Sequence, residues 1–264
     1  MSTVLESVIA DLADEAESLR SILAGLDAHA WSTPTPAEGW NVADQVAHLV
    51  MFDERCMWGI ADPDKFVDDR TAMSGDGVYA AIHDGYASMQ PTLLLARWTE
   101  GNDRLRSAGI TADPKARCMW YGPSMSVVSM LTARLMETWA HGWDVCDAVG
   151  ARMQDTSRLR HVAHIAVGAR AFAYAANKRA VPDAVVRVEL TAPDGSVWAW
   201  GDDTAEQTVR GTALGFCLAA TQRRHVDDCG LTAHGDAAAE WLSIIQAFAG
   251  PPGKGRTRGQ FPPF

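Results

Sequence analysis

Four polar side chains recur at helical spacing in one short segment of the chain: Arg134, Glu137, His141 and Asp144. On a helix these positions share one face, in successive turns. A carboxylate and an imidazole four residues apart, such as Glu137 and His141, can both reach one divalent metal ion. The best third ligand lies much earlier in the chain, at His48. The pattern predicts a metal site formed by two helices, with one coordination position left open for chemistry.

Each of these residues also has a purely structural interpretation. A single histidine on a mostly apolar helix is more often a hydrogen-bonded core residue than a ligand. Glu137 and His141 could form an ordinary helical pair that contributes roughly 0.2–0.5 kcal/mol. His161 and His164 also share a helix face, but no nearby acid completes a metal site there. From spacing alone, the metal site and the structural pair both stay open.

Two predicted helices would carry the three ligands. Asn41 is a good helix N-cap with Asp44 three residues later, which predicts a helix from Asn41 to about Ile60 that includes His48. A second helix is predicted over 126–149 and should end at Gly150, because glycine adopts the left-handed conformation of a helix C-terminus.

Two more helices should complete a bundle. Apolar residues at helical spacing predict a helix over 5–26. A further helix is predicted over 78–108, with a break or kink near Pro91. The acidic segment 61–77 is predicted to be a loop, and 118–124 a connection to the fourth helix. Metal sites in such bundles are built from side chains on facing helices.

The second part of the chain has a different pattern. A helix is predicted over 156–178. Val186, Val188 and Leu190 then alternate with polar residues, as in a strand, and the turn residues 192–195 lead into a second strand, so a β-hairpin is expected. The remaining expectations are helices over 205–223 and 236–249, a short strand near Leu231 and an irregular tail over 253–264. The predicted division is a helical domain over 1–152 and a small α+β domain over 153–264.

Composition limits the classes of partner. The formal net charge of −10 argues against a nucleic-acid backbone or an anionic membrane as the main partner. No stretch reads as a signal peptide or as a membrane span. The five cysteines are scattered and form no CxxC motif, which favours reduced thiols and a cytoplasmic location.

Two stretches resemble a known family. The segment Gly39-Trp40-Asn41-Val42-Ala43-Asp44-Gln45-Val46-Ala47-His48-Leu49 resembles the entry to the metal-binding helix of the DinB-like superfamily. The later Arg134-x-x-Glu137-x-x-x-His141-x-x-Asp144 resembles its second ligand helix. That superfamily typically uses three histidines, and a glutamate in place of one is the variant found in mycothiol-dependent maleylpyruvate isomerases. The resemblance implies a mostly helical α+β fold, in which a DinB-like four-helix bundle precedes a small α+β domain.

The resemblance also implies cofactors and a reaction. In that family the metal is usually zinc, and the open position receives the thiolate of mycothiol. A divalent cation stabilises a thiolate over a thiol, so the bound sulfur is nucleophilic near neutral pH. The implied enzyme uses mycothiol to isomerise an unsaturated acid or to transfer the thiol to a small electrophile. Two imidazoles and a carboxylate suit zinc, and nickel, iron or cobalt would also bind.

The remaining site residues are expectations of the same kind. The family uses an arginine of the C-terminal domain beside the developing enolate or leaving carboxylate, and Arg223 or Arg224 is the counterpart expected here. Arg134 would hold a substrate carboxylate or neutralise Asp144, and Asp144 and Trp143 are expected to bind the cofactor. Two alternatives stay open: a hydrolase with a metal-bound water, and a non-catalytic metal-binding module. The sequence specifies neither the electrophile nor the oligomeric state.

Overall fold

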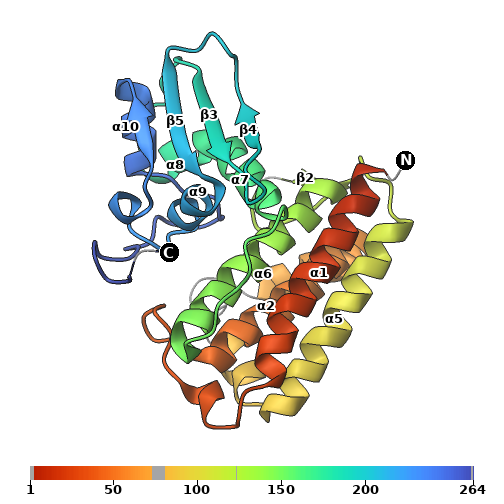
Figure 1. Ribbon diagram of the computed structural model, residues 1–264. Helices are drawn as coiled ribbons and strands as arrows, with labels where there is room; N and C mark the ends of the chain where they lie inside the picture. Colours follow the sequence, from red (N-terminus) through yellow and green to blue (C-terminus); the bar gives the residue numbers. More distant parts are fainter. Residues whose placement is uncertain (1–2, 73–80, 123, 263) are drawn as a thin grey trace. The chain divides into compact units, whose positions relative to one another are not determined.

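The computed structural model describes residues 3–72, 81–122, 124–262 and 264, which form a mostly helical α+β fold (Figure 1). The chain divides into two compact units, Met1–Met153 and Gln154–Phe264. Among the described residues, no helix combines the length and the apolar character needed to cross a membrane.

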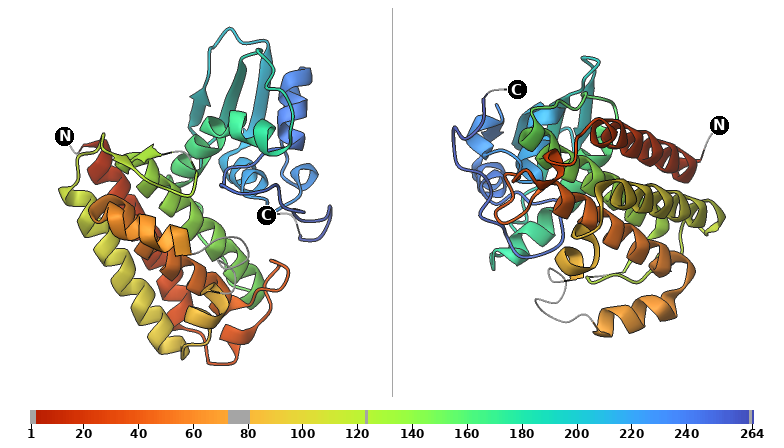
Figure 2. Two further views of the ribbon diagram at one scale, coloured as in Figure 1. Left: turned by 180° about the vertical axis from the view of Figure 1, so that it is seen from behind. Right: turned by 90° about the horizontal axis from the view of Figure 1, so that it is seen from below.

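Four long helices form the bundle of the first unit. They are α1 (Val4–Ala24), α2 (Val42–Ala61), α5 (Pro91–Thr111) and α6 (Val127–Val149). Helix α2 packs along α5 and α6, and α1 packs along the same two helices from the other side (Figures 1 and 2). A short 3₁₀-helix, η1 (Ala30–Ser32), lies between α1 and α2.

Capping interactions set the ends of the two helices that matter for the site. At the start of α2, Asn41 accepts a hydrogen bond from the Asp44 amide at 3.0 Å, and the Asp44 carboxylate accepts one from the Asn41 amide at 2.9 Å. This reciprocal pair is the predicted capping box. Helix α6 begins at the N-cap Ser126 and ends at Gly150, which has the expected left-handed conformation with φ of 68°. Both ligand helices therefore have the predicted boundaries to within about two residues.

The segment 61–77 is not simply a loop as predicted. Helix α3 (Pro63–Ala72) occupies most of it, and residues 73–77 lie outside the described part of the chain. The prediction failed because acidic residues dominate the segment and obscure an apolar anchor within it. That anchor is Phe66, which is fully buried and stacks on Trp120 with ring centroids 5.9 Å apart.

The helix predicted over 78–108 has the break expected near Pro91. A π-helical turn, η2 (His83–Ala87), ends at Ser88, and α5 begins afresh at Pro91. Proline is favoured in the first turn of a helix, where its missing amide hydrogen costs nothing, so Pro91 starts a helix and does not kink one. Residues 78–80 lie outside the described part. The connection to α6 contains a small antiparallel pair, β1 (Arg117–Cys118) with β2 (Met125–Ser126).

The second unit contains a four-stranded sheet with strand order β4-β3-β5-β6. Its strands are β3 (Val186–Thr191), β4 (Val197–Trp200), β5 (Gln207–Thr212) and β6 (Thr232–His234). Strands β3 and β4 form the predicted hairpin, and β5 runs parallel to β3. Its helices are α7 (Leu159–Gly168), α8 (Arg170–Ala176), α9 (Ala213–Ala220), η3 (Val226–Asp228) and α10 (Asp236–Ser243). Helix α9 packs on β3 and β5.

Three helix predictions in this unit need correction. The helix predicted over 205–223 is wrong in its first half, where β5 lies inside the sheet. Thr212 marks the change, because its hydroxyl caps α9 by accepting a hydrogen bond from the Gly215 amide at 3.0 Å. The helix predicted over 156–178 is two helices that meet at Ala169, and the last helix ends at Ser243, before the predicted 249.

Candidate metal centre

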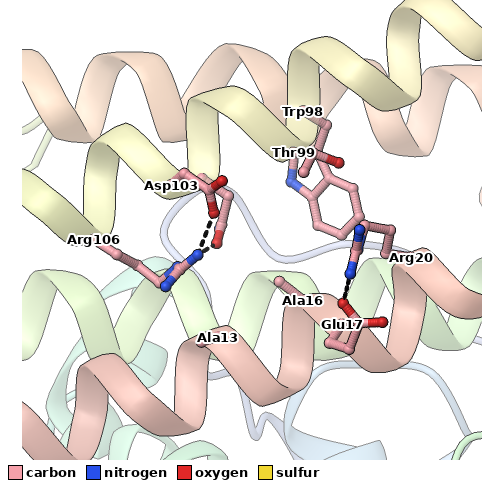
Figure 3. Close-up of a pocket in the computed structure, with 9 residues that line it drawn as sticks. Ala13, Ala16, Glu17, Arg20, Trp98, Thr99, Asp103 and Arg106 are labelled. Atoms are coloured by element: carbon pink, nitrogen blue, oxygen red, sulfur yellow. Dashed lines mark hydrogen bonds and ion pairs between the residues drawn. The ribbon is translucent and has the colours of Figure 1, made fainter.

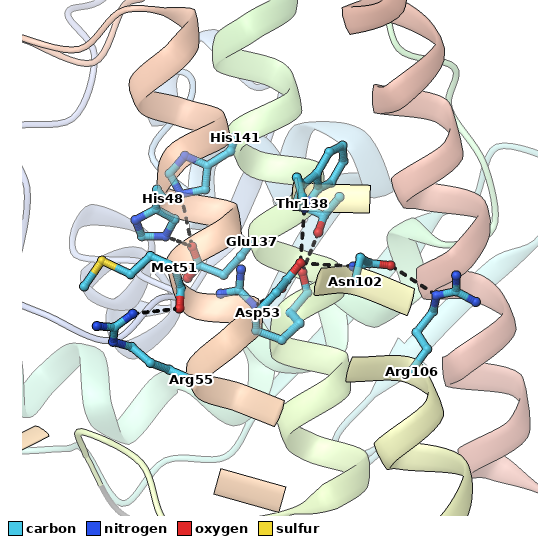
Figure 4. A network of polar contacts seen from close by, with 11 residues as sticks. His48, Met51, Asp53, Arg55, Asn102, Arg106, Glu137, Thr138 and His141 are labelled. Atoms are coloured by element: carbon cyan, nitrogen blue, oxygen red, sulfur yellow. Dashed lines mark hydrogen bonds and ion pairs between the residues drawn. The ribbon is translucent and has the colours of Figure 1, made fainter. Parts of the chain in front are cut away.

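His48, Glu137 and His141 converge within the bundle. Each offers one ligand atom, and these atoms all lie within 4.8 Å of one another. The Nε2 atoms of His48 and His141 lie 3.3 and 3.2 Å from the same oxygen, Oε2 of Glu137 (Figure 4). Helix α2 supplies His48, and helix α6 supplies Glu137 and His141. The two helices are distant in the sequence, but they pack against each other.

The spacing of each imidazole from the carboxylate fits a bound divalent ion. Nitrogen and oxygen ligands lie about 2.0–2.1 Å from zinc, and two ligands at a tetrahedral angle are then about 3.3 Å apart. The two nitrogen–oxygen distances in the cluster agree with this value. Two imidazoles and one carboxylate are also a donor set that zinc accepts in catalytic sites.

The cluster is partly exposed on one side. The side chains of His48, Glu137 and His141 are 17%, 21% and 10% exposed. A solvent molecule or a small ligand can therefore approach from one side. With three protein ligands, a tetrahedral ion there would keep one position open, which is the arrangement of catalytic and not structural zinc sites.

Electrostatics favours the ligand forms of these groups. Burial, with the neighbouring His141 and Arg134 charges, lowers the pKa of His48 to about 3, although contact with Glu137 opposes this. Burial raises the pKa of Glu137, but its contacts with His141 and His48 outweigh that effect and hold the pKa well below its ordinary value. At neutral pH His48 is therefore a neutral imidazole and Glu137 a carboxylate, the forms that bind metal ions.

Aromatic rings border the cluster. Trp40 stacks on His141 with centroids 6.0 Å apart and planes 17° apart, and its centroid lies 5.7 Å from that of His48. Phe52 lies 4.5 Å from the His48 ring and contacts Trp120 and Tyr121. Phe52 was not singled out from the sequence, although its position four residues after His48 places it on the same helix face. Such apolar walls limit water and strengthen electrostatic interactions within a site.

Arg134 lies in a buried polar network behind the cluster. Its Nε donates to Oδ1 of Asp53 at 2.8 Å, while Trp98 Nε1 and Asn102 Nδ2 each donate to Oδ2 at 3.1 Å (Figure 4). Burial lowers the pKa of Arg134, but the charges of Asp53 and Glu137 outweigh this and raise it. Arg134 therefore stays cationic beside Glu137. Its ion-pair partner Asp53 was not singled out from the sequence, because i and i+4 patterns do not reveal partners on other helices.

The other predicted site residues lie elsewhere. Asp144 and Trp143 are buried on α6, three and two residues beyond His141. Arg223 and Arg224 follow α9 in the second unit. Arg223 Nη1 donates to the Thr221 carbonyl at 2.7 Å, and the Arg224 guanidinium lies 3.9 Å from the centroid of the Phe261 ring. The roles expected for these four residues stay predictions. His164 accepts a hydrogen bond from Trp200 at 3.3 Å, in keeping with a structural role.

A hollow elsewhere in the bundle lacks the features of a reactive site. It lies between α1 and α5, has a volume of about 140 Å³ and is lined in part by Trp98 (Figure 3). Its charged groups pair with their own neighbours, Arg20 with Glu17 and Arg106 with Asp103. The charges in this hollow are therefore already neutralised, unlike the converging donors of the candidate metal centre.

The fold and the cluster define a helical-bundle protein with a two-histidine, one-glutamate centre. A family model described as the mycothiol maleylpyruvate isomerase N-terminal domain matches residues 12–146. The chain belongs to this family, which confirms the resemblance seen in the two motifs. The match covers α2, most of α6 and all three candidate ligands.

Relatives and solved structures extend the comparison to almost the whole chain. Uncharacterised proteins from two strains of Mycobacterium tuberculosis, H37Rv and CDC 1551, are each 40% identical over 250 residues, covering 94% of this chain and 97% of the relative. A crystal structure of the mycothiol-dependent maleylpyruvate isomerase aligns with this chain with a TM-score of 0.59 and 18% sequence identity. The crystal structure of its histidine-to-alanine variant aligns with a TM-score of 0.62 and 17% sequence identity. Each alignment covers 88% of this chain and 95% of the other. At such identity the likeness shows a shared fold.

Proposed function

We propose that this protein is a metal-dependent enzyme that uses mycothiol to isomerise a small unsaturated acid, or to transfer the thiol to a small electrophile. The observation that carries the proposal is the convergence of His48, Glu137 and His141 at a partly exposed point, in a family described by mycothiol-dependent isomerisation. When bound, a divalent ion such as zinc would hold the thiol as a thiolate.

The charge of the donor set suits an anionic sulfur. Two neutral imidazoles and one carboxylate leave a dication with a net charge of +1. A thiolate bound there would neutralise that charge, whereas a neutral thiol would not. Arg134 also lies behind Glu137, but the buried Asp53 carboxylate balances its charge, so the net positive charge would come from the ion and its donor set.

The chain offers no reactive thiol of its own. All five cysteines are buried. Burial raises the pKa of each thiol, in the cases of Cys146 and Cys229 to about 12. A thiolate is the nucleophilic form of cysteine. A thiol-dependent reaction at this centre would therefore need an exogenous thiol, as the proposal requires.

The proposed isomerisation returns the thiol unchanged. The sulfur adds to one carbon of a double bond conjugated to a carbonyl, and the π electrons move to the carbonyl oxygen as an enolate. The former double bond is now single and rotates. The enolate then reforms the double bond as the carbon–sulfur bond breaks, which releases the thiolate. In the transfer reaction the sulfur displaces a leaving group and stays attached. Arg223 or Arg224 is the proposed cation for the developing negative charge.

The test begins with elemental analysis of protein purified without added metal, followed by calorimetric titration with mycothiol and assays of turnover. We expect bound zinc, mycothiol affinity that depends on zinc, and loss of both in His48→Ala. His29→Ala is the matched control, because His29 is an exposed histidine of the same unit outside the cluster. A His48→Ala protein that keeps metal and activity would overturn the proposal. Turnover without thiol would instead indicate a hydrolase. Absence of thiol affinity would indicate a non-catalytic metal-binding module.

A further inference from the structure

A chain of hydrogen bonds runs from the three candidate metal ligands to the turn that precedes α2. His141 Nδ1 contacts Oε1 of Gln45, the Gln45 Nε2 donates to the Thr35 hydroxyl at 2.8 Å, and that hydroxyl donates to the Trp40 carbonyl at 2.9 Å. Gln45 is completely buried, one turn before His48 on α2. The chain thus joins a ligand on α6 to α2 and to the loop before it.

The donor and acceptor roles along this chain are fixed by the Trp40 carbonyl at its end. A carbonyl oxygen can only accept, so the Thr35 hydroxyl gives its one hydrogen to Trp40. The hydroxyl oxygen must then accept from Gln45, which turns the amide nitrogen toward Thr35 and the amide oxygen toward His141. That oxygen can only accept, so Nδ1 of His141 carries the ring proton. In a neutral imidazole the other nitrogen, Nε2, then has a free lone pair.

This tautomer affects the contact between His141 and Glu137. Nε2 of His141 lies 3.2 Å from Oε2 of Glu137, and both atoms then present electron pairs to each other. Such a contact is repulsive unless a cation lies between the two atoms. The hydrogen-bond chain therefore favours the form of His141 that binds a metal and opposes the form that would simply donate to Glu137.

The same turn restrains the ring in a second way. The Thr35 amide donates to the Trp40 carbonyl at 2.8 Å, which closes the turn, and the Trp40 ring stacks on His141. The hydrogen bond from Gln45 limits rotation of the imidazole, while the stacked indole limits its tilt. Outer partners of this kind fix the tautomer and orientation of metal-binding histidines, and their loss typically weakens metal binding about 10–100-fold.

We propose that Gln45 is a positioning residue that holds His141 as the Nδ1–H tautomer and so prepares Nε2 for the metal, with Thr35 setting the direction of the Gln45 amide. This inference rests on the proposed metal site and adds two residues that touch neither the ion nor the substrate. Gln45→Leu should remove the hydrogen bond, whereas Gln45→Glu keeps an acceptor for Nδ1–H. Thr35→Val removes only the group that orients the amide.

The experiment combines imidazole NMR of the metal-free protein with zinc affinity measured by chelator competition. In wild type, ¹⁵N–¹H correlation spectra should show His141 as the Nδ1–H tautomer. Gln45→Leu should lose this signature and bind zinc about 10–100-fold more weakly. Thr35→Val should lose less zinc affinity than Gln45→Leu, and the zinc affinity of Gln45→Glu should stay within a few-fold of wild type. Thr132→Val is the matched control for Thr35→Val, because Thr132 is a buried threonine on α6 whose hydroxyl donates to the Val128 carbonyl of its own helix.

The outcomes separate the two proposals. Absence of zinc binding in wild type would overturn the proposed function, but the tautomer of the metal-free protein tests Gln45 directly. An Nε2–H tautomer in wild type would overturn the inference, as would zinc affinity unchanged in a folded Gln45→Leu protein. If Gln45→Leu does not fold, the wild-type tautomer and the Thr35→Val and Gln45→Glu affinities decide the question.

Discussion

His48 and His141 lie on different helices far apart in the sequence, yet their imidazole ring centroids are 4.1 Å apart. Two imidazoles this close repel each other when protonated, and this is one reason why the pKa of His48 is low. In their neutral forms the two imidazoles, together with Glu137, can bind one cation. The proposed metal dependence follows from this pair, and several measurements can test it.

Removal of the metal should abolish activity and lower thermal stability. A ligand that binds only the folded state stabilises it by about 2.7 kcal/mol when present at a hundred times its dissociation constant. Chelation should therefore lower the melting temperature, and added zinc should restore both the temperature and the activity. Glu137→Gln, which keeps the shape but loses the charge, should show a much smaller shift with zinc. A shift of wild-type size in this variant would contradict a ligand role for Glu137.

Arg134→Met should destabilise the bundle itself. The substitution leaves Asp53 buried without its cation, and breaking a buried pair in this way costs about 3–5 kcal/mol. Urea unfolding of the metal-free protein would measure the change. Arg104→Met is the control, since Arg104 forms an exposed helical pair with Glu100 and its loss should change the free energy of unfolding by less than about 1 kcal/mol. Equal effects of the two substitutions would contradict the structural importance of the Arg134 network.

Acidification should destabilise the metal-free protein. The pKa of His48 is about 3 in the fold, against 6.5 for an ordinary histidine. Between these values the unfolded chain binds a proton that the folded chain does not, so the free energy of unfolding falls as the pH falls through this window. Urea midpoints measured from about pH 7 to about pH 4 should therefore decrease, and His48→Gln should reduce the slope. An identical slope in the variant would assign the effect to other groups.

The cysteines should be inert until the protein unfolds. Because burial raises the pKa of Cys146 and Cys229 to about 12 and holds that of Cys56 well above its ordinary value, these thiols stay protonated in mildly alkaline buffer. Labelling with a thiol reagent should be negligible in the native protein and complete in denaturant. Rapid labelling of a native cysteine, located by mass spectrometry of peptides, would contradict this result and reopen the question of an internal nucleophile.

Local patterns in the sequence determined a large part of this protein. The spacing of Glu137 and His141, the capping pair of Asn41 and Asp44, and the β-hairpin around 192–195 were all predicted because each depends on residues within a few positions of one another. The family motif also pointed to His48 as the third member of the cluster. Such patterns are reliable because backbone geometry fixes which near neighbours share a face.

Only the tertiary structure decided which distant groups meet. Nothing local in the sequence indicates that Asp53 neutralises Arg134, that Gln45 contacts His141, or that residues 207–212 form a strand beside β3. Each depends on how whole helices or strands pack, and that packing minimises the free energy of the entire core. The sequence therefore predicted the atoms that could bind a metal, and the fold supplied the partners that set their charge, tautomer and orientation.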